Sequence, residues 1–307
     1  MTSAASARAP VSTFGTGPRR AASRQRFGLF LTLPALGAYC ALILYPFLNS
    51  IRLAFSRSTL MAPEPVFVGL RNFVRLAQDA EFVQSWLRTL VFVVVTTAFT
   101  VLLGLAWAIV LNQRFRGARL LRSISLVPWV IPSAVTALLW AWIFNGQYGV
   151  LNAYLMHFGL IHESVAWLSS EVGAMVGVVL AKTWLSTAFV MTFFLAALQV
   201  LPADHVEAAR LDGASNWQVI WHVVLPYLKG TLVVVTVLQA MGNLQQIDVI
   251  YAMTGGGPAG ATSMLSIEVY KAAFRNWDLG RAAAIGAVWF LTISIPAGIY
   301  LRALFRR

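Results

Sequence analysis

The polar side chains best suited to bind a solute lie within an apolar run in the last third of the chain. The stretch TLVVVTVLQA continues as MGNLQQIDVIY, which sets Asn243, Gln245, Gln246 and Asp248 among aliphatic residues. Amide side chains both donate and accept hydrogen bonds, so they suit a neutral ligand with many hydroxyls. Polar groups are costly at membrane depth, where they face a water-filled path or a partner helix. The pattern therefore predicts a solute path here, or else residues that join helices or lie at the wet membrane surface.

The segment 207–213 has the features of a docking surface rather than of a catalytic site. Glu207 presents one charge beside the small side chains of Ala208 and Ala209, which suits a helix that packs against another protein. Asp212 and Gly213 follow, and glycine tolerates the turn conformation that ends a helix. We therefore expect a short exposed helix that ends at a glycine turn.

A second short helix is predicted directly after this turn. Ser215 can cap it, and Leu225-Pro226 is expected to end it before the next apolar run. Its large apolar side chains recur at the helical spacing i, i+3, i+4 and i+7, at Trp217, Ile220, Trp221 and Val224. The two helices would form a rigid elbow on the water side of a membrane.

The composition is that of a membrane protein, with 59% hydrophobic and 11% charged residues. A helix crosses a bilayer with about 20 apolar residues. Six continuous apolar runs meet this length, at about 28–51, 87–111, 123–144, 172–200, 230–250 and 283–304. Continuous runs disfavour a transmembrane β-barrel, whose strands alternate. We predict an all-α integral membrane protein with six spans, the third of them kinked by Pro128 and Pro132.

The net charge of +12 is best explained by membrane topology. If the N-terminus is cytoplasmic, the inside segments hold 14 Lys and Arg residues and the outside segments hold 8. The positive-inside rule then places both termini and the elbow in the cytoplasm. The distribution argues against a nucleic-acid partner. Residues 1–26, rich in Ala, Ser and Arg, are expected to form a flexible cytoplasmic tail, and residues 27–307 the six-helix domain.

No enzyme motif is present in the sequence. The chain lacks the phosphate-binding G-x-x-x-x-G-K-[ST], the H-E-x-x-H and the G-x-S-x-G patterns. Its four His residues are scattered, and Cys40 is the only cysteine, so neither a metal cluster nor an intrachain disulfide is expected. Catalytic, cofactor and metal residues are therefore not predicted.

The elbow resembles the EAA signature of bacterial ABC importer permeases. The matching residues are Glu207-Ala208-Ala209, Gly213 six positions after the glutamate, and Val223-Val224-Leu225-Pro226. In that family the segment is a coupling helix, here within 201–228, that inserts into a cleft on a cytosolic ATPase. Two further stretches are similar to the family, LAALQVLP at 195–202 and TGGGP at 254–258.

Within that family the chain is most similar to the maltose and glycerol-phosphate importer group. The resemblance covers about residues 27–305 and implies the type I ABC importer permease fold. It also implies that Gln245 and Gln246 match a polar pair that contacts sugar, although the group more often carries Asn there. The implied partners are a sister permease in a heterodimer, an ABC ATPase dimer that holds ATP and Mg, and an extracytoplasmic solute-binding protein. The implied location is the bacterial inner membrane.

Two other functions remain open from the sequence. An ABC permease for a polyamine or an amino acid would share the elbow, but it would carry acidic residues where this chain has Gln245 and Gln246. A proton-coupled secondary transporter would show repeated halves and buried carboxylates, of which Asp248 alone comes close. Lys182, a basic residue inside a predicted span, could serve the path or extend to the membrane surface.

Overall fold

The computed structural model describes residue 30 and residues 32–62, 64–113 and 115–305, which are mostly helical. The tail predicted at 1–26 lies outside the described residues. The chain divides at Arg52 and Leu53 into two compact units, and each is described by itself. The first unit holds most of an apolar helix that begins at Thr32 and includes η1 (Cys40–Leu44) and the start of α2 (Tyr45–Ala54). This helix matches the first predicted run.

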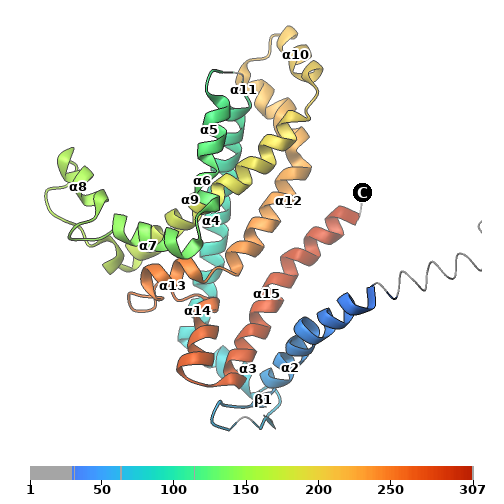
Figure 1. Cartoon of the computed structure of the whole chain (residues 1–307), viewed down its shortest axis with the longest axis vertical. Helices are drawn as coiled ribbons and strands as arrows, with labels where there is room; N and C mark the ends of the chain where they lie inside the picture. The colour runs from blue at the N-terminus through green and yellow to red at the C-terminus, as the bar shows by residue number, and fades with distance from the viewer. Residues whose placement is uncertain (1–29, 31, 63, 114, 306–307) are drawn as a thin grey trace, which may run out of the picture. The chain divides into compact units, whose positions relative to one another are not determined.

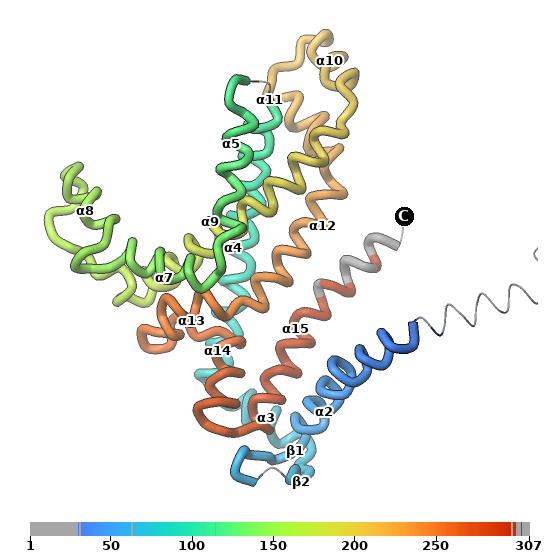
Figure 2. Tube along the Cα trace, in the orientation of Figure 1, coloured from blue at the N-terminus to red at the C-terminus, as the bar shows by residue number. Residues whose placement is uncertain are grey.

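The second unit contains a two-stranded ribbon and a bundle of helices (Figures 1 and 2). The ribbon pairs β1 (Ser56–Arg57) antiparallel with β2 (Val66–Phe67). The helices before the elbow are α3 (Arg71–Gln78), α4 (Ala80–Asn112), α5 (Ala118–Ser125), α6 (Val127–Val130), α7 (Ser133–Ile143), α8 (Val150–His157), η2 (Trp167–Ser169) and α9 (Glu171–Gln199). Those from the elbow onward are α10 (Ala203–Leu211), α11 (Asn216–Val219), η3 (Ile220–Val224), α12 (Leu225–Leu244), α13 (Asp248–Thr254), α14 (Leu265–Tyr270), η4 (Lys271–Arg275) and α15 (Leu279–Phe305).

Four described helices are long and apolar enough to cross a membrane. They are Thr32–Ala54, Ala80–Asn112, Glu171–Gln199 and Asn216–Leu244. A bent pair, Ala118–Val130 with Ser133–Ile143, counts as a fifth if it is one span, and Leu279–Ile295 is a shorter apolar helix. All six predicted runs therefore contain apolar helix, whereas the number of six spans stays a prediction.

The third run is broken more sharply than a kink. The two helices of the bent pair meet at 96°. Ile131 has an extended backbone because the ring of Pro132 disfavours helical geometry in the residue before it. The prediction of a proline-induced distortion is confirmed, and the break frees backbone groups that other elements must satisfy.

The prediction that Leu225-Pro226 ends the elbow helix is wrong, because one helix runs from Asn216 to Leu244. The turn η3 is a π-helix, in which the Leu225 N–H donates to the Ile220 carbonyl, five residues back. Pro226 then stands in the first turn of α12, a position where its missing N–H does little harm. The widened turn lets the helix continue through the proline.

The prediction of a continuous helix over 230–250 is also wrong. Helix α12 ends at Leu244, and α13 begins at Asp248 after a short non-helical stretch (Figure 2). Non-helical backbone at membrane depth persists only where protein buries it or where it lines a water-filled cavity. Gln245 and Gln246 therefore lie in a break of the helix and not in its second half.

Helices α4 and α9 form the central packed pair of the second unit. They lie close together at Gly104, where an added Cβ would lie 2.6 Å from Val190 Cγ1 and 3.1 Å from the Met191 backbone nitrogen. Buried apolar residues of α4, α9 and α12 surround this point. Gly104 therefore sets the distance between the two helices.

We expect Gly104→Ala to destabilise the protein, because the new methyl group must push the two helices apart. Overpacking of this kind costs about 1–3 kcal/mol, and thermal unfolding of the detergent-purified protein would report it as a lower Tm. Gly230→Ala is the matched control, since Gly230 is also helical and an added Cβ there meets nothing within 4 Å. Equal Tm values for the two variants would contradict the packing argument.

Candidate functional site

The break between α12 and α13 lies close to the level of the middle of α4. Asn243 Nδ2 donates to Thr97 Oγ1 at 3.0 Å, and Thr97 lies near the centre of the 33-residue α4. Asn243 is 2% exposed, so it joins two helices across a buried contact. The break at 245–247 starts only two residues later and is therefore at membrane depth.

The four polar residues predicted in this run divide into two buried and two exposed. Gln246 is 9% exposed, and its carbonyl accepts from Ser266 Oγ at 2.8 Å. Gln245 is exposed, as is Asp248, whose Oδ2 accepts from Ser133 Oγ at 2.6 Å. Asn243 therefore joins two helices, as one of the predicted alternatives has it. Gln245 and Asp248 are exposed and can contact a solute or a partner.

Ser133 is the first residue after the break between α6 and α7, so its bond to Asp248 joins the two helix breaks. Sequence reasoning did not single out Ser133, because its partner is 115 residues away. Exposed polar groups at this depth are unsuited to lipid. The surface formed by the two breaks can therefore face water or another protein subunit.

Gln239 is a polar residue of this region that the sequence analysis missed. It precedes Asn243 by one helical turn, is 7% exposed, and its Nε2 has no hydrogen-bond partner among the described residues. Asn243 Oδ1 is likewise without a partner in the described part of the chain. The i, i+4 spacing of Gln239 and Asn243 in VLQAMGN was the signal that could have revealed this polar face.

Lys182 lies on α9, partly buried, within range of the charge of Asp248. It is the twelfth of the 29 residues of this helix and lies away from both helix ends. The structure therefore adds a cation to the polar surface at the helix breaks.

The elbow has the architecture that the sequence predicts up to its second helix. Helix α10 ends at Leu211, and Gly213 follows with a φ of +83°, in the left-handed region that glycine adopts at little cost. Ser215 N donates to Gln218 Oε1 at 2.7 Å, and Gln218 N donates to Ser215 Oγ at 3.4 Å, a capping box. The predicted cap at Ser215 is confirmed.

Most of α10 is open to contact by a partner. Glu207 and Ala208 are exposed, and Leu211 is 88% exposed. Val206 and Ala209 pack against the apolar cluster of α4, α9 and α12. The short helix is thus anchored on one side and presents a charge and an apolar tip on the other.

The inward face of the second elbow helix differs from the predicted one. Val219 and Val224 are buried, whereas Trp217 is 66% and Trp221 52% exposed. The π-helical turn holds one residue more than an α-turn and brings Val219 and Val224, five apart, onto one face. Val224 is thus buried as predicted, whereas Trp217, before the turn, and Trp221, within it, are exposed. The predicted i, i+3, i+4, i+7 pattern assumed a regular α-helix.

A small depression lies beside the turn of the elbow, with a volume of about 260 Å³. Gln218 and His222 form part of its wall, and His222 Nδ1 lies 3.0 Å from the Gln218 carbonyl oxygen. Its other lining residues are Ala209, Asp212, Gly213, Ala214 and Val223. All seven belong to the predicted coupling segment 201–228, and Ala209, Asp212 and Gly213 are among them.

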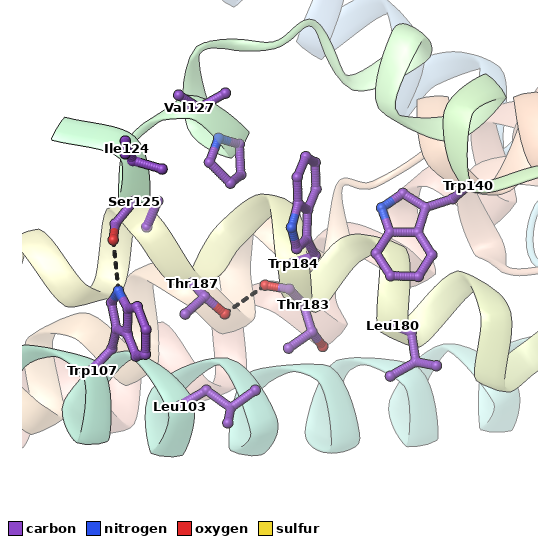
Figure 3. Close-up of a pocket in the computed structure, with 12 residues that line it drawn as sticks. Leu103, Trp107, Ile124, Ser125, Val127, Trp140, Leu180, Thr183, Trp184 and Thr187 are labelled. Carbon is purple, nitrogen blue, oxygen red and sulfur yellow. Dashed lines mark hydrogen bonds between the residues drawn. The ribbon is translucent and has the colours of Figure 1, made fainter. Parts of the chain in front are cut away.

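A larger cavity of about 650 Å³ lies between α4, α9 and the stretch from α5 to α7 (Figure 3). The indoles of Trp107, Trp140 and Trp184 line it. Two of its hydroxyl groups bond within the protein, since Trp107 Nε1 donates to Ser125 Oγ at 2.7 Å and Thr187 Oγ1 donates to the Thr183 carbonyl at 2.7 Å. Thr183 Oγ1 and Trp140 Nε1 have no hydrogen-bond partner among the described residues, but most of the lining is apolar. This lining suits an apolar group better than a polyhydroxylated solute, and it includes none of the predicted path residues.

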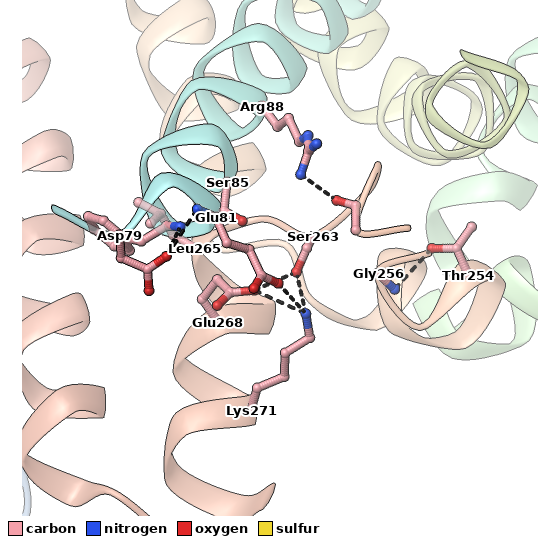
Figure 4. A network of polar contacts seen from close by, with 12 residues as sticks. Asp79, Glu81, Ser85, Arg88, Thr254, Gly256, Ser263, Leu265, Glu268 and Lys271 are labelled. Atoms are coloured by element: carbon pink, nitrogen blue, oxygen red, sulfur yellow. Dashed lines mark hydrogen bonds and ion pairs between the residues drawn. The ribbon is translucent and has the colours of Figure 1, made fainter. Parts of the chain in front are cut away.

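The TGGGP stretch forms a turn that folds back against α4. Gly255 and Gly256 have φ values of +61° and +93°. Arg88 Nη1 donates to the Gly260 carbonyl at 2.7 Å, and Leu265 N donates to Thr89 Oγ1 at 3.0 Å (Figure 4). The turn therefore returns the backbone to the chain's own helix α4.

Ion pairs stabilise the same end of the second unit. Lys271 lies 3.0 Å from Glu268 Oε1, which also accepts from Ser263 Oγ at 2.7 Å (Figure 4). Arg281 Nη2 lies 2.5 Å from Asp79 Oδ2. The hydrogen bond from Arg281 lowers the pKa of Asp79 below its ordinary value, so this carboxylate stays charged at neutral pH. Among the described residues, no group of three or more His, Cys, Asp or Glu is placed to hold a metal ion.

Comparison with known proteins identifies the family. Residues 100–307 match the family described as binding-protein-dependent transport system inner membrane component. The chain is 34% identical over 283 residues to the trehalose/maltose transport system permease protein MalF of Thermococcus litoralis, a match of 92% of this chain and 95% of that protein. It is 30% identical over 275 residues to the sulfoquinovosyl glycerol transport system permease protein SmoG of Agrobacterium fabrum, a match of 89% of each.

A solved structure has the same fold. It is a bacterial alginate ABC transporter in complex with an alginate pentasaccharide-bound periplasmic protein, with a TM-score of 0.81 at 18% identity over 92% of this chain and 95% of the matched chain. The predicted type I ABC importer permease fold is confirmed, and so is the prediction of a transport subunit rather than an enzyme. The chain belongs to the binding-protein-dependent transport system inner membrane components and is a permease subunit of an ABC importer.

Proposed function

We propose that this chain and a sister permease together form the path for a sugar or sugar-like solute. The observation that carries the proposal is the polar surface at the two helix breaks, where Gln245 and Asp248 are exposed at membrane depth. Amides and a carboxylate can exchange hydrogen bonds with hydroxyl groups as a solute leaves water. The path residues are then Gln245, Gln246, Asn243 and Asp248, with Gln239 beside them.

The relatives support a carbohydrate substrate. The MalF and SmoG relatives are named for trehalose/maltose and for sulfoquinovosyl glycerol, and this chain matches most of the length of both. A polyamine or amino-acid substrate is less well supported, because charged solutes call for more acidic groups than Asp248 alone. Membership of a binding-protein-dependent family argues against a proton-coupled transporter.

The elbow supports a role in energy coupling. We propose that Glu207, Ala208, Ala209, Asp212 and Gly213 contact one subunit of an ATPase dimer, which holds ATP and Mg, so that this chain needs no cofactor of its own. Closure of the ATPases would move α10 and the attached spans as a unit and open the path to the other side of the membrane. A binding protein would deliver the solute there. Such coupling requires contacts at α10 that differ between the two states.

The orientation follows from the charge distribution. Both termini and the elbow are proposed to lie in the cytoplasm, since the inside segments carry more Lys and Arg residues. In this arrangement residues 1–26 form a cytoplasmic tail and residues 27–307 the membrane domain. The polar network around Lys271 and Arg281 then lies on the outer side, where a binding protein would approach.

Purification of the tagged chain from its native membrane in mild detergent tests the assembly directly. We expect mass spectrometry to identify an ABC ATPase, a second permease and a solute-binding protein among the co-purifying proteins. The captured binding protein can then be screened with a panel of sugars by thermal shift. Recovery of the chain alone, from membranes in which uptake is active, would contradict the proposal.

We expect Glu207→Lys and Gly213→Val each to abolish uptake without preventing membrane insertion. The first variant reverses an exposed charge, and the second forces a β-branched residue into a left-handed backbone at a cost of about 1–2 kcal/mol. Uptake of the radiolabelled sugar and ATPase recovery after purification are the measurements. Glu163→Lys, at an exposed site in the loop after α8, is the matched charge reversal and should transport normally. Wild-type uptake by both elbow variants would refute the coupling role.

A second pair of variants distinguishes a residue that contacts the solute from a residue that joins two helices. Gln245→Ala should leave Tm unchanged but weaken uptake about two- to tenfold, the value of about one hydrogen bond. Asn243→Ala should lower Tm, because it leaves the buried Thr97 hydroxyl unpaired at a cost of about 1–3 kcal/mol. Adding Thr97→Val should recover part of that loss. A stable Gln245→Ala variant with full uptake at limiting sugar would exclude Gln245 from the path.

A further inference from the structure

Lys182 is a cation without a close partner in the interior of a span. It lies 11 residues after the first residue of α9 and 17 before the last. Its side chain is partly buried, and in the described part of the chain it takes part in no hydrogen bond and in no ion pair of 4.0 Å or less. A buried ammonium at this depth requires a counter-charge, water or a ligand.

Asp248 supplies the counter-charge from a distance. Ala181 and Val249, the sequence neighbours of Lys182 and Asp248, belong to the same buried cluster, so the two helices pack together at this level. The charge of Asp248 acts on Lys182, but their nitrogen and oxygen atoms are more than 4.0 Å apart. Ser133 holds one carboxylate oxygen of Asp248 at 2.6 Å and thereby fixes its position.

The other charged residues of the surrounding helices lie toward the helix ends. Helix α4, which packs against α9, carries Glu81 and Arg88 within its first three turns. Helix α7 has no charged residue, and Asp248 is the only one in α13. The other charges of α9 and α12 are Glu171, at the start of α9, and Lys229, in the first turns of α12, 19 residues before Asp248. The site therefore carries one positive and one negative group and no net charge.

We propose that Lys182 and Asp248 form a charge-balanced site that accepts an uncharged, polyhydroxylated solute and excludes anions such as sugar acids and sugar phosphates. The inference rests on the proposed path and specifies its substrate class. A hydroxyl group can donate to Asp248 and accept from Lys182, and hydrogen bonds to charged groups are the stronger kind. An anion is attracted by Lys182 but repelled by Asp248. The pair therefore favours an uncharged solute over an anion, because it combines an attractive group with a repulsive one.

The charge of the site can be measured with thiol reagents of opposite charge. Cys40 is the only cysteine of the chain, so Cys40→Ser gives a background without reactive thiols. In that background Gln245→Cys, three residues before Asp248, is labelled in the assembled importer by anionic sulfonatoethyl and by cationic trimethylammonioethyl methanethiosulfonate. The readout is the ratio of the two labelling rates, compared in the presence of Asp248→Asn or Lys182→Gln. His162→Cys, exposed in the loop after α8, is the matched control position.

The native pair should give a rate ratio at Gln245→Cys close to that at His162→Cys. Asp248→Asn should raise the relative rate of the anionic reagent about threefold or more, and Lys182→Gln should favour the cationic reagent to a similar extent, since each leaves one charge unbalanced. If both reagents label Gln245→Cys but neither substitution changes the ratio of their rates, the charge-balanced site is wrong. The proposed path would not be affected by that result. If neither reagent labels Gln245→Cys, water does not reach this surface. That result would overturn both the proposed path and this inference.

Discussion

The absence of water in the hydrocarbon layer is the constraint on which the second unit depends. Every backbone group freed by a helix break must find a partner within the protein or in a water-filled space. The two breaks, after α6 and after α12, meet this constraint together. Ser133 at the start of α7 donates to Asp248 at the start of α13, and Ser266 donates to the Gln246 carbonyl. The bond from Ser266 of α14 thus satisfies a backbone carbonyl of the second break, and the bond from Ser133 joins the side chains at the two breaks.

The same constraint accounts for the polar residues on α4. This helix buries Ser85, Thr89, Thr96, Thr97 and Thr100, whose small hydroxyl groups can bond within a turn or across to a neighbouring helix. Thr89 Oγ1 donates to the Ser85 carbonyl and accepts from Leu265 N, and Thr97 accepts from Asn243. Thr89 and Thr97 thus join α4 to the segments from α12 onward, whereas the hydroxyls of Ser85, Thr96 and Thr100 have no hydrogen-bond partner among the described residues.

Local signals in the sequence predicted the local structure well. The glycine turn at Gly213, the cap at Ser215 and the distortion at Pro132 each depend on residues within a few positions, and all three are present. The continuation of the helix through Pro226 could not be foreseen, because a π-helical turn of ordinary aliphatic residues absorbs the proline. The apolar face of that helix was misassigned in part, since Val224 is buried as predicted whereas Trp217 and Trp221 are exposed.

The roles of the polar residues depended on partners that no local pattern reveals. Asn243, Gln245, Gln246 and Asp248 look alike in sequence, yet two are buried and two are exposed. What separates them is contact with residues far along the chain, such as Thr97, 146 positions before Asn243, and Ser133. Sequence alone therefore identified the region of the candidate site, but not which of its polar residues are buried and which are exposed.

The unbroken helix through Pro226 has a mechanical consequence. Because the π-helical turn joins the capped elbow to α12 without a hinge, the 20 residues of α12 act as a lever arm about 30 Å long. A tilt of about 10° at the elbow end would sweep the far end through about 5 Å, roughly the width of a sugar ring, on this helical geometry. The far end of the lever is the break at 245–247. In the coupling proposed above, this continuity would carry a tilt of the elbow to the break at 245–247, a consequence that Pro226 in the sequence did not suggest.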